Sequence, residues 1–380
     1  MKIKTITCHD VYNYGASLQA YALQSFLQRQ GHTVEIIDYL PDYRKKRYDF
    51  LTLWSKNRLL QRVTSYLPFL KPIVATIKNR KKIYHYYKDG FYRRKQAFDH
   101  FKSSHLTTTP VCYRSLNQLI ENKPEADLYI AGSDQIWNTN NCQNGSDGAF
   151  YCAFEPQPDK CISYAASFGC DYVNSEYVST VKDGLKHLRA ISVRESSGVI
   201  LVEGLGFKAC EVLDPVFLLD KSDWESLCSV KRDGDYLLLY DFLHNDPNLK
   251  KATLDVSEKR QLKIISINDF SEIDYADENV NNAGPIEFLE YVRGAKFVIS
   301  SSFHATAFSV IFQKDFLTFP LVGHGNFSRM KDFLDGLDMS ERFMTEATET
   351  SLASIDYGKV QEILEEKKKE SKKWIVNNLK

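Results

Sequence analysis

The chain has 380 residues, of which 43% are hydrophobic and 26% are charged, and its formal net charge is zero. This length and composition are typical of a globular protein that is large enough to hold two domains. A neutral chain is a poor match for a protein that binds nucleic acid through charge alone, so we expect no nucleic-acid partner.

The first 40 residues predict a strand, a polar loop, a helix and a second strand. The first strand covers residues 2–7, and apolar residues then recur at helical spacing between Leu18 and Leu27. Residues 33–38 form a second extended apolar run. Such a βαβ unit favours a parallel sheet. The loop before the helix lacks the GxGxxG pattern, so it carries no dinucleotide-binding fingerprint.

The start of the chain reads as this strand and not as a signal peptide. No apolar run approaches the roughly 20 residues that are needed to cross a bilayer. The eight cysteines show no CxxC pair and no metal-finger spacing, which favours reduced thiols in a protein core. We therefore expect a cytoplasmic protein.

A strongly basic segment follows. Residues 44–102 contain 17 Lys and Arg against three Asp, and apolar and aromatic residues such as Phe50, Trp54 and Tyr84 are interleaved with them. This pattern is typical of basic amphipathic helices that lie on an anionic membrane surface. The alternative is a helical insertion, residues 41–105, that packs on its own domain and exposes a solvated basic face. We favour contact with the inner face of the plasma membrane.

Beyond the basic segment the chain alternates between apolar strands and helices. The expected strands cover residues 127–131, 161–166, 190–193, 209–213, 236–240, 262–267, 296–299 and 316–319. The expected helices cover residues 248–260, 285–293 and 305–313, followed by a charged helix over 358–380. Strands that end in polar or small residues place ligands at the edge of an open α/β sheet.

The alternation predicts an α/β protein with two Rossmann-like, doubly wound domains. Residues 1–220 form the first domain with its basic insertion, residues 221–345 form the second, and residues 346–380 form a helical tail. Two such units in succession are similar to the glycosyltransferase-B (GT-B) architecture, in which ligands bind between the domains. This analogy concerns the fold and does not settle the chemistry.

Two segments, one in each half, are suited to binding an anion. Residues 300–308 (SSSFHATAF) place serines and a histidine at the start of a helix, where free backbone N–H groups attract negative charge. Residues 192–195 (SVRE) place a guanidinium at the end of another strand. Together they indicate a cleft for a small anionic substrate.

Five motifs occur in order along the chain, namely residues 13–20 (NYGASLQA), 132–138 (GSDQIWN), 192–195 (SVRE), 214–215 (DP) and 302–304 (SFH). Together they resemble the polysaccharide pyruvyl transferase family over most of the chain, apart from the basic insertion. The resemblance implies a GT-B-like fold. It also implies an enzyme that moves a pyruvyl group from phosphoenolpyruvate onto a sugar and forms a cyclic ketal.

On this resemblance, Arg194 is expected to hold phosphoenolpyruvate, because a guanidinium binds a carboxylate or a phosphate through two hydrogen bonds. His304 is the candidate for acid–base catalysis, since ketal formation needs a proton on the methylene carbon and a deprotonated hydroxyl. Ser302 and Phe303 belong to the same donor site, and Arg329 is expected to add a second cation for phosphate. Structural roles for Arg194 and His304 are the alternatives.

Asp134 is the catalytic candidate on the acceptor side, where its carboxylate could bind sugar hydroxyls or take their proton. The remaining substrate-binding candidates are Asn13, Tyr14, Gly15, Ser133, Gln135, Trp137 and Asn138. Trp137 is assigned to stacking on a sugar face, with a core position as the alternative. Helix capping is the alternative for Asp134 and for Asn13. Asp214 is expected to serve as a turn or cap before Pro215.

The chain shows no HExxH, P-loop, Ser–His–Asp or DxD signature, so we expect neither a metal nor a cofactor. We predict a pyruvyltransferase of capsular or exopolysaccharide biosynthesis. Its sugar acceptor is either linked to polyprenyl diphosphate or already polymerised. The alternatives are a glycosyltransferase that uses a nucleotide sugar and a non-catalytic carbohydrate-binding protein.

Overall fold

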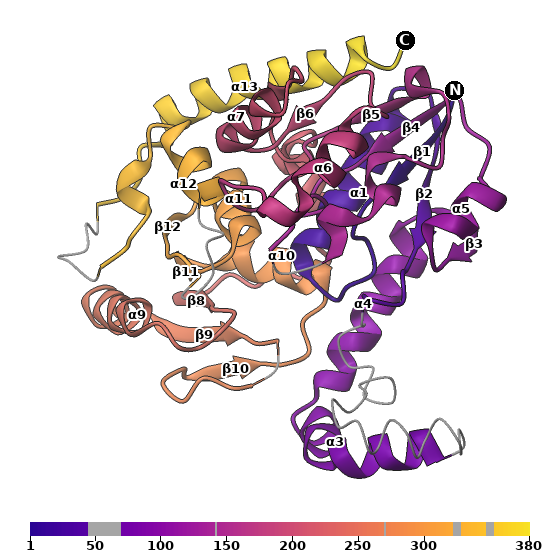
Figure 1. Cartoon of the computed structure of the whole chain (residues 1–380). Coiled ribbons are helices and arrows are strands. Elements are labelled where there is room, and N and C mark those ends of the chain that lie inside the picture. The colour runs from indigo at the N-terminus through magenta and orange to yellow at the C-terminus, as the bar shows by residue number, and fades with distance from the viewer. Residues whose placement is uncertain (45–69, 141–142, 270, 322–327, 347–352) are drawn as a thin grey trace.

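The computed structural model describes residues 1–44, 70–140, 143–269, 271–321, 328–346 and 353–380. Two five-stranded parallel sheets form its centre, in the orders β3-β2-β1-β4-β5 and β10-β9-β8-β11-β12 (Figure 1). We call the first of these sheets, together with the helices packed on it, the first lobe. The second sheet and its helices form the second lobe. The strand order reverses between β1 and β4 and between β8 and β11, and ligands of such sheets bind at the carboxyl side of that point.

The strands of the first lobe are β1 (Lys2–Ile6), β2 (Thr33–Tyr39), β3 (Thr108–Tyr113), β4 (Leu128–Ala131) and β5 (Cys161–Ser163), followed by the short pair β6 (Ser192–Val193) and β7 (Cys210–Glu211). Those of the second lobe are β8 (Tyr236–Tyr240), β9 (Lys263–Ile267), β10 (Glu278–Val280), β11 (Phe297–Ser300) and β12 (Asp315–Thr318). The described α-helices are α1 (Tyr14–Arg29), α3 (Leu70–Lys88), α4 (Phe91–His105), α5 (Leu116–Glu121), α6 (Val178–Leu185), α7 (Ser196–Gly204), α8 (Lys221–Leu227), α9 (Pro247–Arg260), α10 (Pro285–Gly294), α11 (Phe303–Ile311), α12 (Ser328–Asp335) and α13 (Tyr357–Asn377).

These elements confirm the predicted fold class, but sequence reasoning missed β3 and β10. Both are edge strands with weak strand signals: Pro110 interrupts β3, and β10 is only three residues long. The strand expected over 161–166 ends earlier, at Ser163, because Ala165 has a left-handed φ of 53°. The predicted domain limits at residues 220 and 345 stay predictions.

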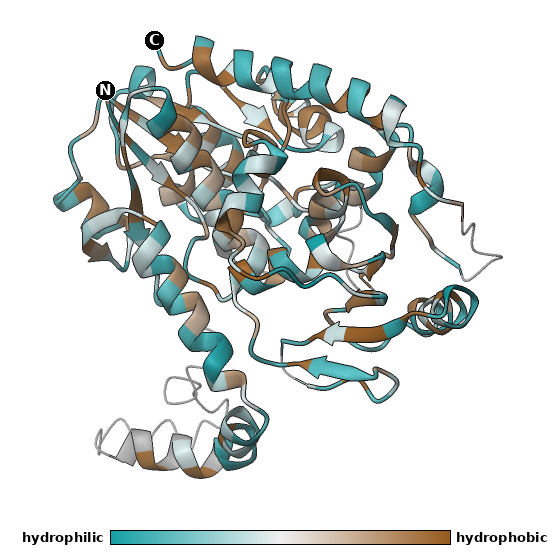
Figure 2. Cartoon of the chain, turned by 180° about the vertical axis from the view of Figure 1, so that it is seen from behind, coloured by the Kyte–Doolittle hydropathy of each residue, from teal (hydrophilic) through white to brown (hydrophobic). Residues whose placement is uncertain are grey.

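The apolar residues gather in the strands and in the helices between them, whereas α13 is mostly polar (Figure 2). α13 follows the second lobe but runs back over α7 and β6 of the first (Figure 1). The Ser371 hydroxyl accepts a hydrogen bond from the Leu213 backbone at 2.9 Å, and Arg189 donates to the Asn378 carbonyl at 2.6 Å. The predicted C-terminal helix thus packs on the first lobe.

The predicted basic insertion includes α3 and α4, and its residues 45–69 lie outside the described part of the chain. α4 lies against the body of the molecule, while α3 projects away from both sheets (Figure 1). We call these two helices the arm. None of the helices among the described residues is both long enough and apolar enough to span a membrane.

Candidate active site

The first turns of two helices, one from each lobe, touch at the centre of the molecule. α1 begins after Asn13, whose side chain accepts a hydrogen bond from the Ala16 backbone at 3.1 Å. α11 begins after β11, and Ser302 caps it. A Cβ atom added at Gly15 would lie only 1.8 Å from Nδ1 of His304. Glycine is therefore required here because the imidazole of the other lobe occupies the space of a side chain.

Asp214 joins three segments of the site through one carboxylate oxygen. Its Oδ2 lies 2.6 Å from Nη1 of Arg194 and accepts a hydrogen bond from the Ser133 hydroxyl at 3.1 Å. The same oxygen is 3.5 Å from Nε2 of His304. Burial opposes ionisation of Asp214, but the neighbouring His304 and Arg194 outweigh it and hold its pKa well below the ordinary range. The predicted guanidinium and imidazole thus converge on one carboxylate.

Several buried nitrogens of this cluster have no hydrogen-bond partner among the described residues. They are Nε and Nη2 of Arg194 and Nε of Arg329, whereas Nε2 of His304 has the contact with Asp214 at 3.5 Å. The guanidinium carbons of Arg194 and Arg329 lie 4.5 and 5.9 Å from the Phe303 ring centroid, so one ring is shared by two cations. Buried N–H groups are almost always satisfied in native proteins, so a cluster of unpaired ones indicates a site for an anion.

The two arginines also differ in their electrostatic surroundings. Burial and then the positive charge of Arg194 lower the pKa of Arg329 to about 10. Asp214 and Glu195 outweigh the effect of burial on Arg194 and raise its pKa. Arg329 is therefore the cation that lacks sufficient negative charge, and an anion bound beside it would supply that charge.

Glu195 supports Arg194 and a neighbouring loop. Its Oε1 accepts hydrogen bonds from the Ser167 hydroxyl and the Phe168 backbone, each at 2.9 Å. Its Oε2 lies 3.9 Å from Nε of Arg194 and has no hydrogen-bond partner in the described structure. Burial raises the pKa of Glu195. In the sequence Glu195 is only the last residue of the SVRE motif, because its role depends on contacts between distant segments.

The segment after β4 reaches across to the second lobe. With its amide oxygen turned toward Arg329, Gln135 accepts hydrogen bonds from both terminal nitrogens of that guanidinium, at 2.6 and 2.8 Å. Asp134 has a φ of 75° and is partly exposed, and its charge favours the ionised forms of Arg194 and Arg329. Asp134 is thus the partly exposed carboxylate next to the two arginines.

The model of the family described as polysaccharide pyruvyl transferase matches residues 13–320. The chain belongs to the polysaccharide pyruvyl transferase family. The match confirms the family that the motifs predicted and indicates a transferase enzyme. No curated protein matches the sequence.

Solved structures show the fold that this family member adopts. The UDP-GlcNAc 2-epimerase of Methanocaldococcus jannaschii, in complex with UDP-GlcNAc and UDP, is similar with a TM-score of 0.51 at 10% identity over 100% of this chain and 99% of that one. MnaA of S. aureus, in its co-structure with UDP, is similar with a TM-score of 0.50 at 10% identity over 100% and 95%. At this identity the likeness concerns the fold alone, and it confirms the GT-B-like architecture.

Three predicted site residues of this polysaccharide pyruvyl transferase lie outside the anion-binding cluster. Trp137 is fully buried and stacks on Tyr151 with ring centroids 5.2 Å apart, so it presents no face to a sugar. Asn138 is also fully buried and accepts a hydrogen bond from the Asn140 backbone. The Tyr14 hydroxyl donates to the Ala283 carbonyl at 2.9 Å, between the lobes. We leave Trp137 out of the proposed site.

Arg44 is a further candidate that sequence reasoning counted only within the basic segment. It follows β2, whose carboxyl end lies at the same sheet edge as Asp134, and its Nη1 is buried without a hydrogen-bond partner in the described structure. Burial opposes its charge, but Cys8 and Asp134 outweigh burial and raise the pKa of Arg44. Its place after a strand of the parallel sheet is the signal that could have identified it.

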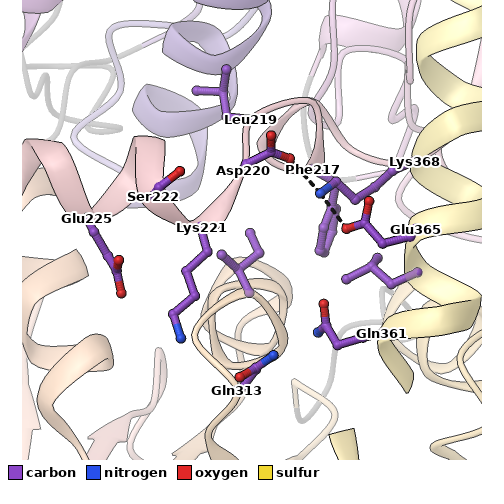
Figure 3. A pocket seen from close by; sticks show the side chains of 12 residues that line it. Phe217, Leu219, Asp220, Lys221, Ser222, Glu225, Gln313, Gln361, Glu365 and Lys368 are labelled. Carbon is purple, nitrogen blue, oxygen red and sulfur yellow. Dashed lines mark hydrogen bonds and ion pairs between the residues drawn. The ribbon is translucent and has the colours of Figure 1, made fainter. Parts of the chain in front are cut away.

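A cavity of about 510 Å³ opens elsewhere, between α8, α11 and α13, and we call it the α13 cavity (Figure 3). It is lined by Phe217, Leu219, Asp220, Lys221, Ser222, Glu225, Ile311, Gln313, Gln361, Leu364, Glu365 and Lys368. None of the predicted site residues is among them. No group of three or more His, Cys, Asp or Glu side chains within the described ranges is placed to hold a metal ion.

Proposed function

We propose that this enzyme transfers a pyruvyl group from phosphoenolpyruvate to two hydroxyls of a sugar, with release of phosphate, in capsular or exopolysaccharide biosynthesis. The observation that carries the proposal is the set of buried nitrogens without hydrogen bonds on Arg194 and Arg329, which lie beside His304 where the lobes meet. Family membership supports a sugar acceptor and a donor. Phosphoenolpyruvate, which carries a carboxylate and a phosphate, matches the charge of the cluster.

The donor would bind between Arg194 and Arg329, against the first turn of α11. Free nitrogens on both guanidiniums can donate to phosphate or carboxylate oxygens, and the N-terminus of α11 adds a favourable dipole. Gly15 would leave room for the imidazole of His304 beside the donor, because the side chain of any larger residue at position 15 would displace the imidazole. The lobes would thus supply complementary parts of one donor site.

The reaction would proceed by addition followed by displacement. One sugar hydroxyl attacks C2 of phosphoenolpyruvate and loses its proton, while C3 gains a proton and becomes a methyl group. The bond between C2 and the phosphate oxygen then breaks and phosphate leaves. The second hydroxyl bonds to C2, loses its proton and closes the ketal. His304 is our candidate for protonating C3, and Asp134 is our candidate base for the hydroxyl.

The arm would hold the enzyme at an anionic membrane, where an acceptor linked to polyprenyl diphosphate would be found. Four apolar or aromatic side chains of α3 are more than half exposed and recur at helical spacing, namely Ile73, Ile77, Tyr84 and Tyr87. Arg80, Lys81 and Lys82 lie between them, and Lys88 follows Tyr87. Exposed apolar and basic residues on one helix are typical of binding at a lipid surface. Absence of flotation with anionic liposomes at low salt would exclude this contact.

The donor is tested by thermal shift and by phosphate release. Phosphoenolpyruvate should raise the melting temperature of the protein, and labelled phosphoenolpyruvate should release phosphate when a panel of lipid-linked sugars is added. His304→Ala should stay folded and lose phosphate release. A shift with nucleotide sugars alone would instead favour a glycosyltransferase. Sugar binding without any turnover would favour a non-catalytic protein.

A further inference from the structure

Arg94 of α4 lies at the boundary between the two lobes and contacts both. It is fully buried, and its Nη2 lies 2.6 Å from Oδ1 of Asp269, which follows β9 in the second lobe. On the side of the first lobe, its Nε donates to the Tyr14 hydroxyl and its Nη1 to the Tyr12 carbonyl, each at 3.1 Å. One guanidinium of the arm therefore joins the start of α1 to the second sheet.

Aromatic packing fixes the plane of this guanidinium. Its central carbon lies 4.7 Å from the ring centroid of Tyr14 and 4.6 Å from that of Phe98. Tyr14 in turn stacks on Phe288 of the second lobe, with centroids 4.6 Å apart and planes within 9°. Tyr14 is the residue directly before Gly15. The Arg94 contacts are thus one residue away from the glycine that receives His304.

Further contacts seat α4 on the second lobe. The Asn281 side chain donates to the carbonyl of Asp89 at 3.1 Å. A Cβ atom added at Gly284 would lie 2.6 Å from the Cβ atom of Ala97, so the two backbones approach closely there. A basic insertion that only covered its own domain would not make such contacts.

A buried ion pair is weak evidence for stability, because apolar residues of similar volume often replace it without loss. Arg94 and Asp269 are both almost fully removed from water, with side chains 0% and 3% exposed. Apolar residues could fill the same volume, but only the guanidinium of Arg94 can make directional hydrogen bonds to Asp269, Tyr14 and Tyr12. The Arg94–Asp269 pair is therefore better explained by a role in positioning the two lobes than by a contribution to stability.

We propose that Arg94 is a positioning residue that sets the arrangement of the two lobes, and with it the contact between Gly15 and His304. The arm acts as a strap between the lobes in addition to any contact with a membrane. This inference goes beyond the proposed function and requires neither a particular donor nor a particular acceptor.

The test replaces the whole pair and measures lobe geometry without substrate. The double variant Arg94→Met with Asp269→Met leaves no unpaired buried charge, so its melting temperature should stay close to that of the wild type. The matched control is Lys123→Met with Glu155→Met, which removes a pair at 2.5 Å within the first lobe. Small-angle scattering reports the radius of gyration. Carbethoxylation followed by mass spectrometry reports the accessibility of His304, which is only 7% exposed.

The proposal expects a larger radius of gyration and modification of His304 that is faster by about tenfold in the Arg94/Asp269 variant, and no change in the control. A folded Arg94/Asp269 variant with the radius and modification rate of the wild type would overturn it. If that variant does not fold, Arg94→Lys keeps the charge but loses the fork. Faster His304 modification in Arg94→Lys supports the proposal, and an unchanged rate contradicts it. Because these measurements use no substrate, they stand even if pyruvyl transfer is not the activity.

Discussion

Positively charged side chains have different partners in the cluster where the lobes meet and in the α13 cavity. In the α13 cavity, Lys368 lies 2.7 Å from both Asp220 and Glu365, so its ammonium group is neutralised locally (Figure 3). In the cluster where the lobes meet, Arg194 and Arg329 keep buried nitrogens without hydrogen-bond partners in the described structure. In this protein, the candidate site is therefore identified by buried nitrogens that lack hydrogen-bond partners and not by the volume of a cavity.

The largest effect that this comparison predicts is at Arg194. Arg194→Met should reduce kcat/KM by about a thousandfold, because a buried charged partner of an anion typically contributes about 4 kcal/mol. It should also destabilise the fold, since Asp214 and Glu195 lose their counter-charge. Steady-state kinetics with phosphoenolpyruvate measure the first effect and chemical denaturation the second. Exposed Arg93 provides the control variant, Arg93→Met, and equal losses in both variants would remove the distinction between the cluster and the surface.

The next effect concerns the contact between the lobes. Gly15→Ala should lower kcat by about a hundredfold, because the new methyl group displaces the imidazole of His304 and small misplacements in a site are costly. Gly204→Ala is the matched control, since a Cβ atom there meets nothing within 4 Å. Single-turnover phosphate release would measure both variants. Wild-type turnover in Gly15→Ala would show that the position of His304 does not matter for the chemistry.

The lowered pKa of Asp214 should make the stability of the protein depend on pH. Its pKa is lower in the folded protein than in the unfolded chain, so its ionised form stabilises the fold above the unfolded pKa, near 3.9. That contribution is lost as the pH falls through the lower, folded pKa. Asp214→Asn should therefore lower the free energy of unfolding by about 3 kcal/mol at every pH from 7 down to 5. The difference from the wild type should shrink only in strong acid. Urea unfolding at several pH values measures it, and a difference that grows toward acid would contradict the assignment.

The smallest effect is expected in the α13 cavity. Lys368→Met should leave kcat/KM unchanged and reduce the free energy of unfolding by less than about 1 kcal/mol, because Asp220 and Glu365 are both largely exposed. Parallel kinetics and denaturation measure the two quantities. A substantial loss of activity would place the α13 cavity in the functional machinery and would undo the comparison.

Much of the fold could be predicted from the sequence because buried parallel strands are continuous apolar runs. Examples are β8 (Tyr236–Tyr240) and β11 (Phe297–Ser300), and polar residues follow both strands at the edge where such sheets bind ligands. β10 could not be predicted, because its three residues carry little apolar signal and its pairing with β9 decides its conformation. Apolar runs predict a strand only where most of its residues are buried.

The candidate site could be predicted in its parts and not in its connections. Arg194 and His304 follow strands, and their residue types indicate anion binding. The role of Asp214 as their common neighbour depends on a meeting of segments far apart in the sequence, and nothing local distinguishes it from a turn residue. Trp137 belongs to the same motif as Asp134, yet it is buried in the core and stacks on Tyr151. Side-chain direction at a strand end is a property of the tertiary structure.

The return of α13 onto the first lobe has a consequence for how the protein is made. A ribosome releases the chain from its N-terminus, and domains generally begin to fold as they emerge. The backbone N–H of Leu213, directly before Asp214, donates its hydrogen bond to the Ser371 hydroxyl in α13. This hydrogen bond therefore cannot form until the second lobe and α13 have been synthesised. Nascent chains that stop short of residue 371 should lack it, and they are the species that chaperones would meet during translation.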